Sequence, residues 1–154
     1  MNILDHASYS ASDVTIESRE PIFRGFIQVE KVSFRHRLFN QPDYSPVIQR
    51  ELIHRPEAAG VLLYNDQQQR FALIEQFRVG ALNDSESAWQ LEVIAGVLDG
   101  DEAPEDCIRR ESLEESGCEV QQLQHLFSFY PSAGACSEFF HLYAAEVELP
   151  KIGG

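Results

Sequence analysis

Three glutamates with helical spacing are the part of this sequence best suited to chemistry. Glu111, Glu114 and Glu115 lie between Pro104, a residue favoured at the first helical position, and Gly117, which suits the position after a helix end. The spacing therefore predicts a helix over residues 104–116. At 100° per residue the three carboxylates share an arc of about 100°. Like charges at these spacings repel each other and weaken a helix. A nearby positive charge should therefore offset the repulsion among the three carboxylates.

A divalent cation is one candidate for that role. Mg²⁺ and Mn²⁺ prefer several oxygen ligands, and Mg²⁺ commonly keeps substrate phosphates among them. A glycine-containing loop before the helix could bring a backbone carbonyl and the substrate to the same ion. This arrangement favours metal-assisted attack of water on a phosphoryl group. The alternative is a solvated acidic face, which is common in a chain whose net charge is −13.

Composition narrows the classes of partner. The 154 residues suit one domain with a core, and 44% of them are hydrophobic. The net charge of −13 argues against nucleic acid or an anionic membrane as a partner. A small anionic ligand would need a local cluster of arginines or a metal ion.

The cysteines and the apolar runs predict the cellular compartment of the protein. The three cysteines contain no CxxC pair and indicate reduced thiols. The N-terminus does not resemble a signal peptide, and the longest apolar run, residues 58–64, is too short for a bilayer. We therefore expect a soluble, cytoplasmic protein.

The helix is expected to sit in a mixed α+β domain. Residues 1–18 carry little pattern, and residues 23–40 alternate as a strand does before a turn at 41–46. Trp89 is expected in the core. A soft boundary near residues 55–58 would separate an N-terminal antiparallel β unit from a domain with a largely antiparallel or mixed sheet. Further strands are expected at 47–56, in a hairpin around residues 65–69, and at 88–98, 123–131 and 138–149.

The acidic helix and the loop before it resemble the Nudix box, G-x5-E-x7-R-E-U-x-E-E-x-G-U, where U is a bulky aliphatic residue. Ser112 and Cys118 depart from the pattern at the two U positions. The segments FRGF, FRHRLFN, LIEQFR, WQLEVIAG and SAGACSE extend the resemblance to the bacterial ADP-ribose pyrophosphatases of this superfamily, over roughly residues 14–150. All fixed positions of the box match, as Gly96, Glu102, Arg110, Glu111, Glu114, Glu115 and Gly117.

The resemblance implies an architecture and an activity. The fold would be a Nudix-type α/β/α sandwich with a mixed sheet over residues 57–154, preceded by an N-terminal antiparallel β unit over residues 1–56. That unit would exchange between two subunits, giving a homodimer with a shared active site. The enzyme would hydrolyse ADP-ribose to AMP and ribose 5-phosphate with Mg²⁺, for which Mn²⁺ could substitute.

The resemblance also assigns residues. The catalytic group would comprise Arg110, Glu111, Glu114 and Glu115, with an Arg110–Glu102 ion pair bracing the helix against its loop. The general base would lie beyond Gly154, so the hydrolase domain would be truncated here. The metal ligands would be the Ala95 carbonyl, Glu111, Glu114 and Glu115. Substrate contacts would come from Phe26, Ile27, Arg50, Glu51, Arg55, Arg78, Val97, Ser132, Ala133, Gly134 and Glu138.

Two alternatives remain at this stage. The substrate could be another nucleoside diphosphate sugar, such as GDP-mannose, because the residues around Phe26 do not fix the base. A non-catalytic Nudix domain that senses a nucleotide is the second alternative. Retention of Glu111, Glu114 and Glu115 together favours the enzyme.

Overall fold

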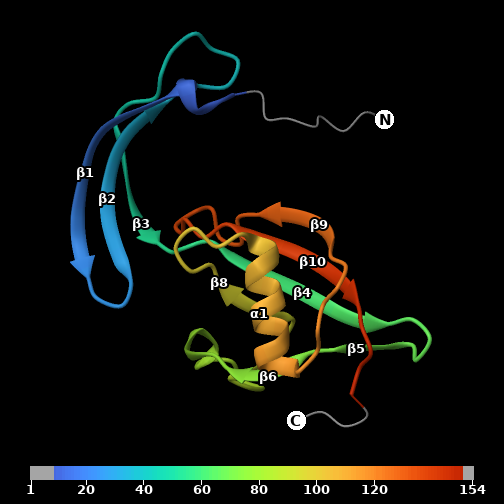
Figure 1. Ribbon diagram of the computed structural model, residues 1–154. Coiled ribbons are helices and arrows are strands. Elements are labelled where there is room, and N and C mark those ends of the chain that lie inside the picture. The colour runs from blue at the N-terminus through green and yellow to red at the C-terminus, as the bar shows by residue number, and fades with distance from the viewer. Residues whose placement is uncertain (1–8, 151–154) are drawn as a thin grey trace. The chain divides into compact units, whose positions relative to one another are not determined.

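The computed structural model describes residues 9–150, which divide into two units. The N-terminal unit comprises residues 9–55 together with Ser132–Ser137. The helical unit comprises Pro56–Pro131 together with residues 138–150. Each unit has its own sheet (Figure 1).

The N-terminal unit is a three-stranded antiparallel sheet in the order β1-β2-β3. Every residue of β1 is exposed, including four apolar ones: Val14, Ile16, Ile22 and Phe23. A short 3-10 helix, η1, precedes the sheet, and Ser10 caps it. The bounds are η1 Ala11–Asp13, β1 Val14–Arg24, β2 Gln28–His36 and β3 Ile48–His54.

This unit differs from the expectation at its start. The first strand begins at Val14, within a segment that has little sequence pattern. The pattern is absent because a strand that is exposed along its whole length needs no alternation of apolar and polar residues. The expected single run over residues 23–40 is broken by a turn, in which the Gly25 N–H donates to the Ile27 carbonyl (3.0 Å).

The helical unit is built on a mixed sheet. β4 pairs parallel with β10 and antiparallel with both β5 and β8, and β9 pairs antiparallel with β10. A separate ribbon is formed by β6 and β7. The bounds are β4 Ala58–Asn65, β5 Arg70–Ala72, β6 Ile74–Phe77, η2 Val79–Ala81, β7 Trp89–Glu92, β8 Ile94–Val97, α1 Pro104–Ser116, β9 Gln124–Phe129 and β10 Phe140–Glu146.

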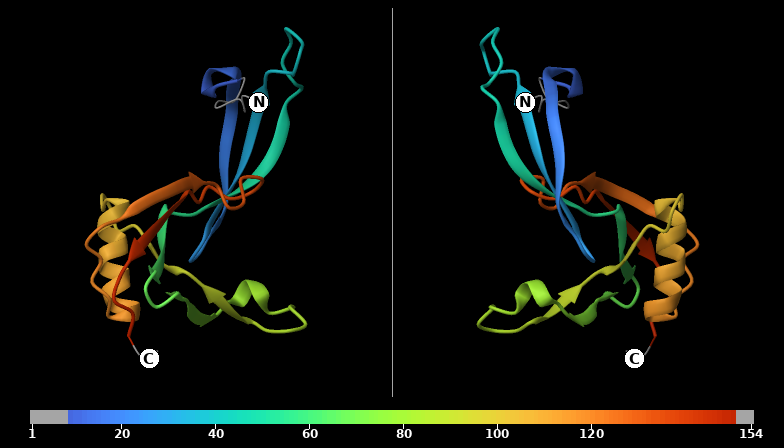
Figure 2. Two further views of the ribbon diagram at one scale, coloured as in Figure 1. Left: turned by 90° about the vertical axis from the view of Figure 1, so that its right-hand side faces the viewer. Right: turned by 90° about the vertical axis from the view of Figure 1, so that its left-hand side faces the viewer.

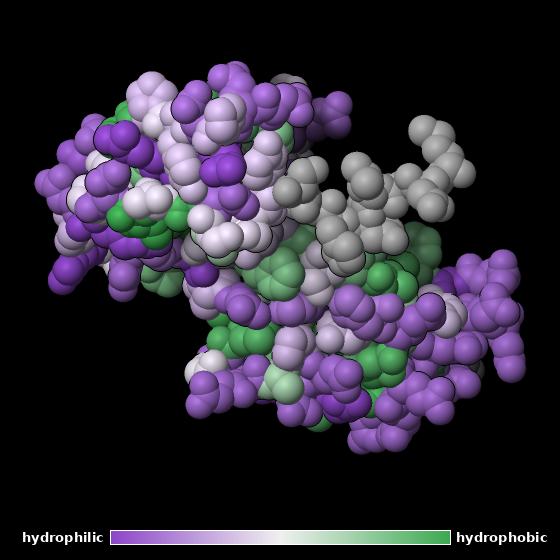
Figure 3. All heavy atoms as spheres, turned by 90° about the horizontal axis from the view of Figure 1, so that it is seen from above, coloured by the Kyte–Doolittle hydropathy of each residue, from purple (hydrophilic) through white to green (hydrophobic). Residues whose placement is uncertain are grey.

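The core of this unit lies between the sheet and α1. Strand β4 is buried almost continuously, as expected for a central strand with a parallel neighbour. Figures 1 and 2 show α1 along one face of the sheet, where it contributes Cys107 and Ile108 to the core cluster. In the space-filling view, apolar patches interrupt a largely polar face (Figure 3).

The expected helix is confirmed at both ends. Pro104 is its first residue, and Glu105 and Asp106 lie in its first turn, where acidic groups favour the helix dipole. Gly117 has a left-handed φ of 69° and donates its N–H to the Leu113 carbonyl (3.0 Å). The α+β class is confirmed as well. None of the helices in the described part of the chain is long and apolar enough to cross a membrane.

Two expectations for residues 88–98 are corrected. The single expected strand is two strands, and they pair with different neighbours: β7 with β6, and β8 with β4. Trp89 is not a core residue, since it is 58% exposed and packs edge-on against Phe77 (5.3 Å between ring centroids). Position 89 lies on a separate two-stranded ribbon, on the face that carries the exposed side chains of Trp89 and Leu91.

Candidate active site

Arg110 is the cation that offsets the charge of the helix carboxylates. Its Nε and Nη2 donate to the two oxygens of Glu102 (3.1 and 3.0 Å). Its Nη1 donates to Glu111 (2.6 Å) and lies 3.7 Å from a Glu114 oxygen. One guanidinium therefore contacts three carboxylates, and the hydrogen bonds to Glu102 and Glu111 raise the pKa of Arg110 above its ordinary value.

Glu102 fixes the loop that precedes α1. Besides its two bonds to Arg110, it accepts the backbone N–H of Asp99 (3.1 Å). These bonds to Arg110 and Asp99 lower the pKa of Glu102. The expected ion pair between Glu102 and Arg110 is therefore formed, and it joins the loop to the helix.

Two residues of β8 lie directly against the helix carboxylates. A Cβ atom placed on Gly96 would be 2.5 Å from Glu111 Cγ and closer still to its carboxylate. Glu115 accepts a hydrogen bond from the Ala95 backbone. Loss of solvent raises the pKa of Glu115, the charge of Glu111 raises it further, and the Ala95 bond partly opposes both.

The donor set suits a hard cation. It combines carboxylates with the backbone of Ala95, and two of its carboxylates, Glu111 and Glu115, raise each other's energy by repulsion. A divalent ion would relieve that repulsion. Within residues 9–150, however, no three acidic, thiol or imidazole side chains already form a metal-holding group. Glu111 is instead hydrogen bonded to Arg110.

Arg78, which is expected to contact the substrate, is hydrogen bonded to Glu92, a residue that the sequence did not single out. Its Nε donates to both oxygens of Glu92 (2.9 and 3.0 Å), and its Nη2 donates to one of them (2.6 Å). This bond raises the pKa of Arg78, and the charges of Glu115 and Glu138 raise it further. The only sequence signal was a single acidic residue ending the run WQLE, on the face opposite Trp89 and Leu91.

The helical unit thus brings together much of the expected site. It holds Ala95, Glu111, Glu114, Glu115, Arg78 and Glu138, with Arg78 in the electrostatic field of Glu115 and Glu138. Val97, 39% exposed on β8, places its carbonyl 3.4 Å from Arg110 Nη2.

The remaining expected substrate residues belong to the N-terminal unit. Phe26 is 97% exposed in the β1–β2 turn, so it is not a core residue there. Arg50 and Glu51 line a cavity of about 370 Å³ with Lys31 and Gln49. The other members of this unit are Ile27, Arg55, Ser132, Ala133 and Gly134.

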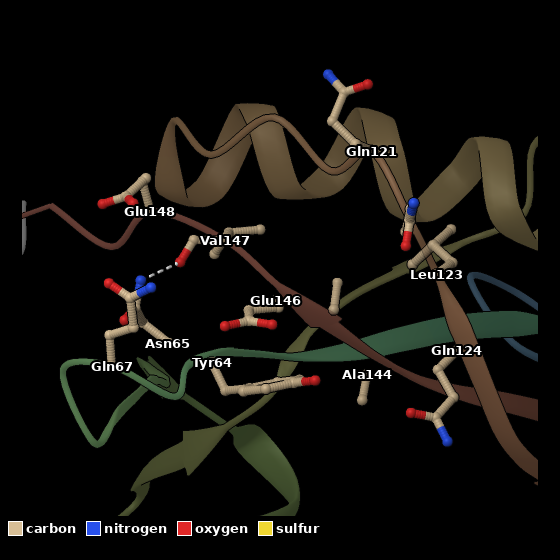
Figure 4. Close-up of a pocket in the computed structure, with 12 residues that line it drawn as sticks. Tyr64, Asn65, Gln67, Gln121, Leu123, Gln124, Ala144, Glu146, Val147 and Glu148 are labelled. Carbon is tan, nitrogen blue, oxygen red and sulfur yellow. Dashed lines mark hydrogen bonds between the residues drawn. The ribbon is translucent and has the colours of Figure 1, made fainter.

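A larger cavity of the helical unit does not coincide with this site. It measures about 530 Å³ and lies beside β4 and β10, with Tyr64, Asn65 and Glu146 among its lining residues (Figure 4). Asn65 Nδ2 donates to the Val147 carbonyl at its wall (2.9 Å). The lining contains no Lys or Arg, so it offers nothing to pair with a diphosphate.

Comparison with known proteins identifies several relatives. The NUDIX domain profile matches residues 54–152. The ADP-ribose pyrophosphatase of Escherichia coli strain K12 is 37% identical over 147 residues, covering 96% of this chain and 70% of that protein. The protein of the same name from Haemophilus influenzae is 36% identical over 149 residues, covering 95% and 68% of the two chains.

Two further matches bear on substrate and fold. The GDP-mannose pyrophosphatase of Citrobacter koseri is 46% identical over 98 residues, which are 63% of this chain and 51% of that protein. A crystal structure described as an ADP compounds hydrolase superposes with a TM-score of 0.69 at 24% identity, covering 96% of this chain and 75% of that one. The structural match supports the fold alone, and the expected sandwich fold is confirmed.

Proposed function

Because this chain belongs to the NUDIX domain family, we propose that it hydrolyses the diphosphate bond of ADP-ribose, yielding AMP and ribose 5-phosphate. The observation that carries the proposal is the contact of Glu111 and Glu115 with the backbone of β8, and the charge of Glu115 also acts on Arg78. Identity with two ADP-ribose pyrophosphatases over nearly the whole chain supports this substrate.

The reaction needs a divalent cation, for which we propose Mg²⁺ or, in its place, Mn²⁺. Glu111, Glu114, Glu115 and the Ala95 carbonyl would hold it. The bound ion would supply charge neutralisation at the diphosphate and a lower pKa for the attacking water. Release of Glu111 from Arg110 Nη1 would free its carboxylate for this role, while Glu102 keeps the other side of the Arg110 guanidinium in place.

Arginines of the protein would orient the substrate. Arg78 of one copy, with Arg50 and Arg55 reaching across from the N-terminal unit of the second copy, suit the diphosphate because a guanidinium binds two oxygens at once. Water adds its oxygen to one phosphorus, and the bond from that phosphorus to the bridging oxygen breaks. The bridging oxygen leaves with the other phosphate, and the proton of the water passes to solvent through a base that we do not assign.

The remaining contacts concern the nucleoside and the loop. Phe26 is suited to stack on adenine because its ring is almost fully exposed. We propose further contacts from Ile27, Glu51, Val97, Ser132, Ala133, Gly134 and Glu138.

We also propose that two copies of the chain form a homodimer through residues 1–56, with residues 57–154 as the hydrolase domain. The exposed apolar side chains of β1 favour this, since Val14, Ile16, Ile22 and Phe23 would lose their contact with water. A shared active site would follow if the N-terminal unit is exchanged. Three unpaired cysteines are consistent with a cytoplasmic location.

A second nucleoside diphosphate sugar is a specific alternative, because the GDP-mannose pyrophosphatase of Citrobacter koseri is 46% identical over a shorter stretch of 98 residues. Parallel assays with ADP-ribose and GDP-mannose, with AMP and GMP separated by chromatography, decide between them. We expect kcat/KM to be higher for ADP-ribose. A higher value for GDP-mannose would reverse the assignment, and cleavage of neither would favour a nucleotide sensor.

A further inference from the structure

Arg78 is held at two points within the helical unit, one on its backbone and one on its side chain. Its backbone N–H donates to the Ala88 carbonyl (2.8 Å), which ties the end of β6 to the start of β7. Its side chain forms three hydrogen-bond contacts to Glu92 at the other end of β7. The register of the ribbon, Phe77 opposite Trp89 and Ile74 opposite Glu92, sets the spacing of these two attachments.

Glu92 uses only one edge of that guanidinium. An arginine carries five N–H groups, and Glu92 accepts from Nε and Nη2. Nη1 takes no part in the three contacts to Glu92. The pairing therefore holds the arginine while leaving two adjacent nitrogens, Nη1 and Nη2, with N–H groups for a second bidentate partner.

Neighbouring charges explain why such a restraint is needed. Glu115 and Glu138 also act on Arg78 electrostatically. An arginine not held by Glu92 would be drawn toward Glu115, one of the carboxylates proposed to hold the metal. If Arg78 paired with Glu115, the N–H groups of the arginine would no longer be open to the substrate, and the carboxylate of Glu115 would no longer be open to the metal.

We propose that Glu92 is a positioning residue, which holds the Arg78 guanidinium by Nε and Nη2 so that its Nη1–Nη2 edge binds a diphosphate oxygen of the substrate. This inference rests on the proposed function, in which Arg78 contacts the diphosphate. It assigns Glu92 no contact with the substrate or the metal. Arg78 is the more exposed partner, with 49% of its side chain accessible against 27% for Glu92, so a ligand could approach the arginine without unfolding the ribbon.

The test compares Glu92→Gln with Glu75→Gln. Glu75 is the matched control because it lies on the same β6–β7 ribbon, at an exposed position beside Leu91, and undergoes the same chemical change. We expect Glu92→Gln to raise KM for ADP-ribose about tenfold while kcat changes much less, and Glu75→Gln to alter neither. Glu92→Asp, which keeps the charge, should recover part of the loss.

A binding measurement separates positioning from a general structural role. Calorimetric titration with inorganic pyrophosphate, in the presence of a chelator, reports diphosphate binding without turnover. We expect Glu92→Gln to weaken it about tenfold in the native background and to have no further effect in an Arg78→Ala background. Equal weakening in both backgrounds would overturn the proposal, as would an unchanged KM in folded Glu92→Gln.

The outcomes also distinguish the two proposals. If the native protein hydrolyses ADP-ribose and Glu92→Gln has no effect on the reaction, the inference about Glu92 is wrong and the proposed function stands. Absence of hydrolysis by the native protein would sink the proposed function, while the pyrophosphate titrations would still decide whether Glu92 acts through Arg78. Loss of Mg²⁺ affinity in Glu92→Gln, measured without substrate, would make Glu92 a metal ligand and contradict a positioning role.

Discussion

Gly96 lies directly against the carboxylate of Glu111, so closely that a methyl group on its α-carbon would overlap that side chain. The glycine is therefore needed for space. Its φ is not in the left-handed region, unlike those of Gly100 and Gly117. This contact explains physically why a proposed metal ligand on a helix requires a glycine fifteen positions earlier, on the neighbouring strand.

The first prediction follows from that contact. Gly96→Ala should push the Glu111 carboxylate from its place and lower Mg²⁺ affinity by about tenfold to a hundredfold. Isothermal titration with Mg²⁺ measures this. Gly80→Ala is the control, because Gly80 has no heavy atom within 4 Å of an added Cβ and no positive φ. Equal Mg²⁺ affinity in the two variants would contradict the account.

The second prediction concerns Arg110, which contacts Glu102, Glu111 and Glu114 at once. Arg110→Lys retains the charge but cannot span these carboxylates, because an ammonium lacks the planar fork. We expect Mg²⁺ affinity and kcat to fall by about tenfold to a hundredfold.

Its neighbour provides the comparison. Within residues 9–150, Arg109 pairs with the exposed Glu105 and Asp106 of the same helix. Arg109→Lys should therefore leave affinity and rate within about twofold, as for an ordinary surface ion pair. A similar loss in both variants would mean that general helix charge, and not the arrangement around Arg110, accounts for the effect.

The third prediction concerns pH. The folded protein raises the pKa of Glu115 above its value in the unfolded chain, first through loss of solvent and then through the charge of Glu111. A carboxyl with a raised folded pKa contributes stability below its unfolded pKa and loses that contribution as pH rises through the folded value. Without metal, Glu115→Gln should therefore raise the melting temperature at pH 7 and change it little at pH 4.

The control for this measurement is Glu119→Gln, at an exposed position just beyond the helix. Thermal unfolding in a chelator at the two pH values compares the variants. A lower melting temperature for Glu115→Gln than for the native protein at pH 7 would show that Glu115 stabilises the fold, which is the opposite of this prediction.

The fourth prediction addresses Ser112, one of the two residues that depart from the Nudix box. It is fully buried, and its Oγ has no hydrogen-bond partner within the described residues. Because a buried hydroxyl without a partner costs about 1–3 kcal/mol, Ser112→Ala should raise the free energy of unfolding by about 1 kcal/mol.

Ser116 offers the opposite case on the same helix. Its Oγ donates to the Ser112 carbonyl (2.6 Å) and accepts the Cys118 N–H (3.3 Å), so Ser116→Ala should destabilise the protein. Urea unfolding of the two alanine variants measures both changes. Destabilisation by Ser112→Ala would mean that the serine hydroxyl makes a contact in solution that the structure lacks.

The helix could be predicted to the residue because its signals are local. Pro104 and Gly117 mark its ends through backbone geometry that depends on no distant contact. The ion pair of Glu102 with Arg110 was also predictable, since it joins a loop to the helix that follows.

Features set by distant partners could not be read from the sequence. The pairing of Arg78 with Glu92 depends on the register of the β6–β7 ribbon, and the exposure of Trp89 accompanies the separation of this ribbon from the five-stranded sheet. The division of residues 88–98 between two sheets has the same origin. Trp89 lies on a strand that pairs with β6 and Ile94 on a strand that pairs with β4, and hydrophobic periodicity does not reveal which strands pair.

The most direct test of the account is hydrolysis of ADP-ribose with Mg²⁺ by the native full-length protein and by its Glu111→Gln and Glu115→Gln variants, with AMP quantified. The account predicts AMP formation by the native protein and a loss of at least about a hundredfold in kcat/KM in each variant, because each removes a metal-holding carboxylate. Native-like turnover in both variants would contradict it, as would a native protein that releases no AMP.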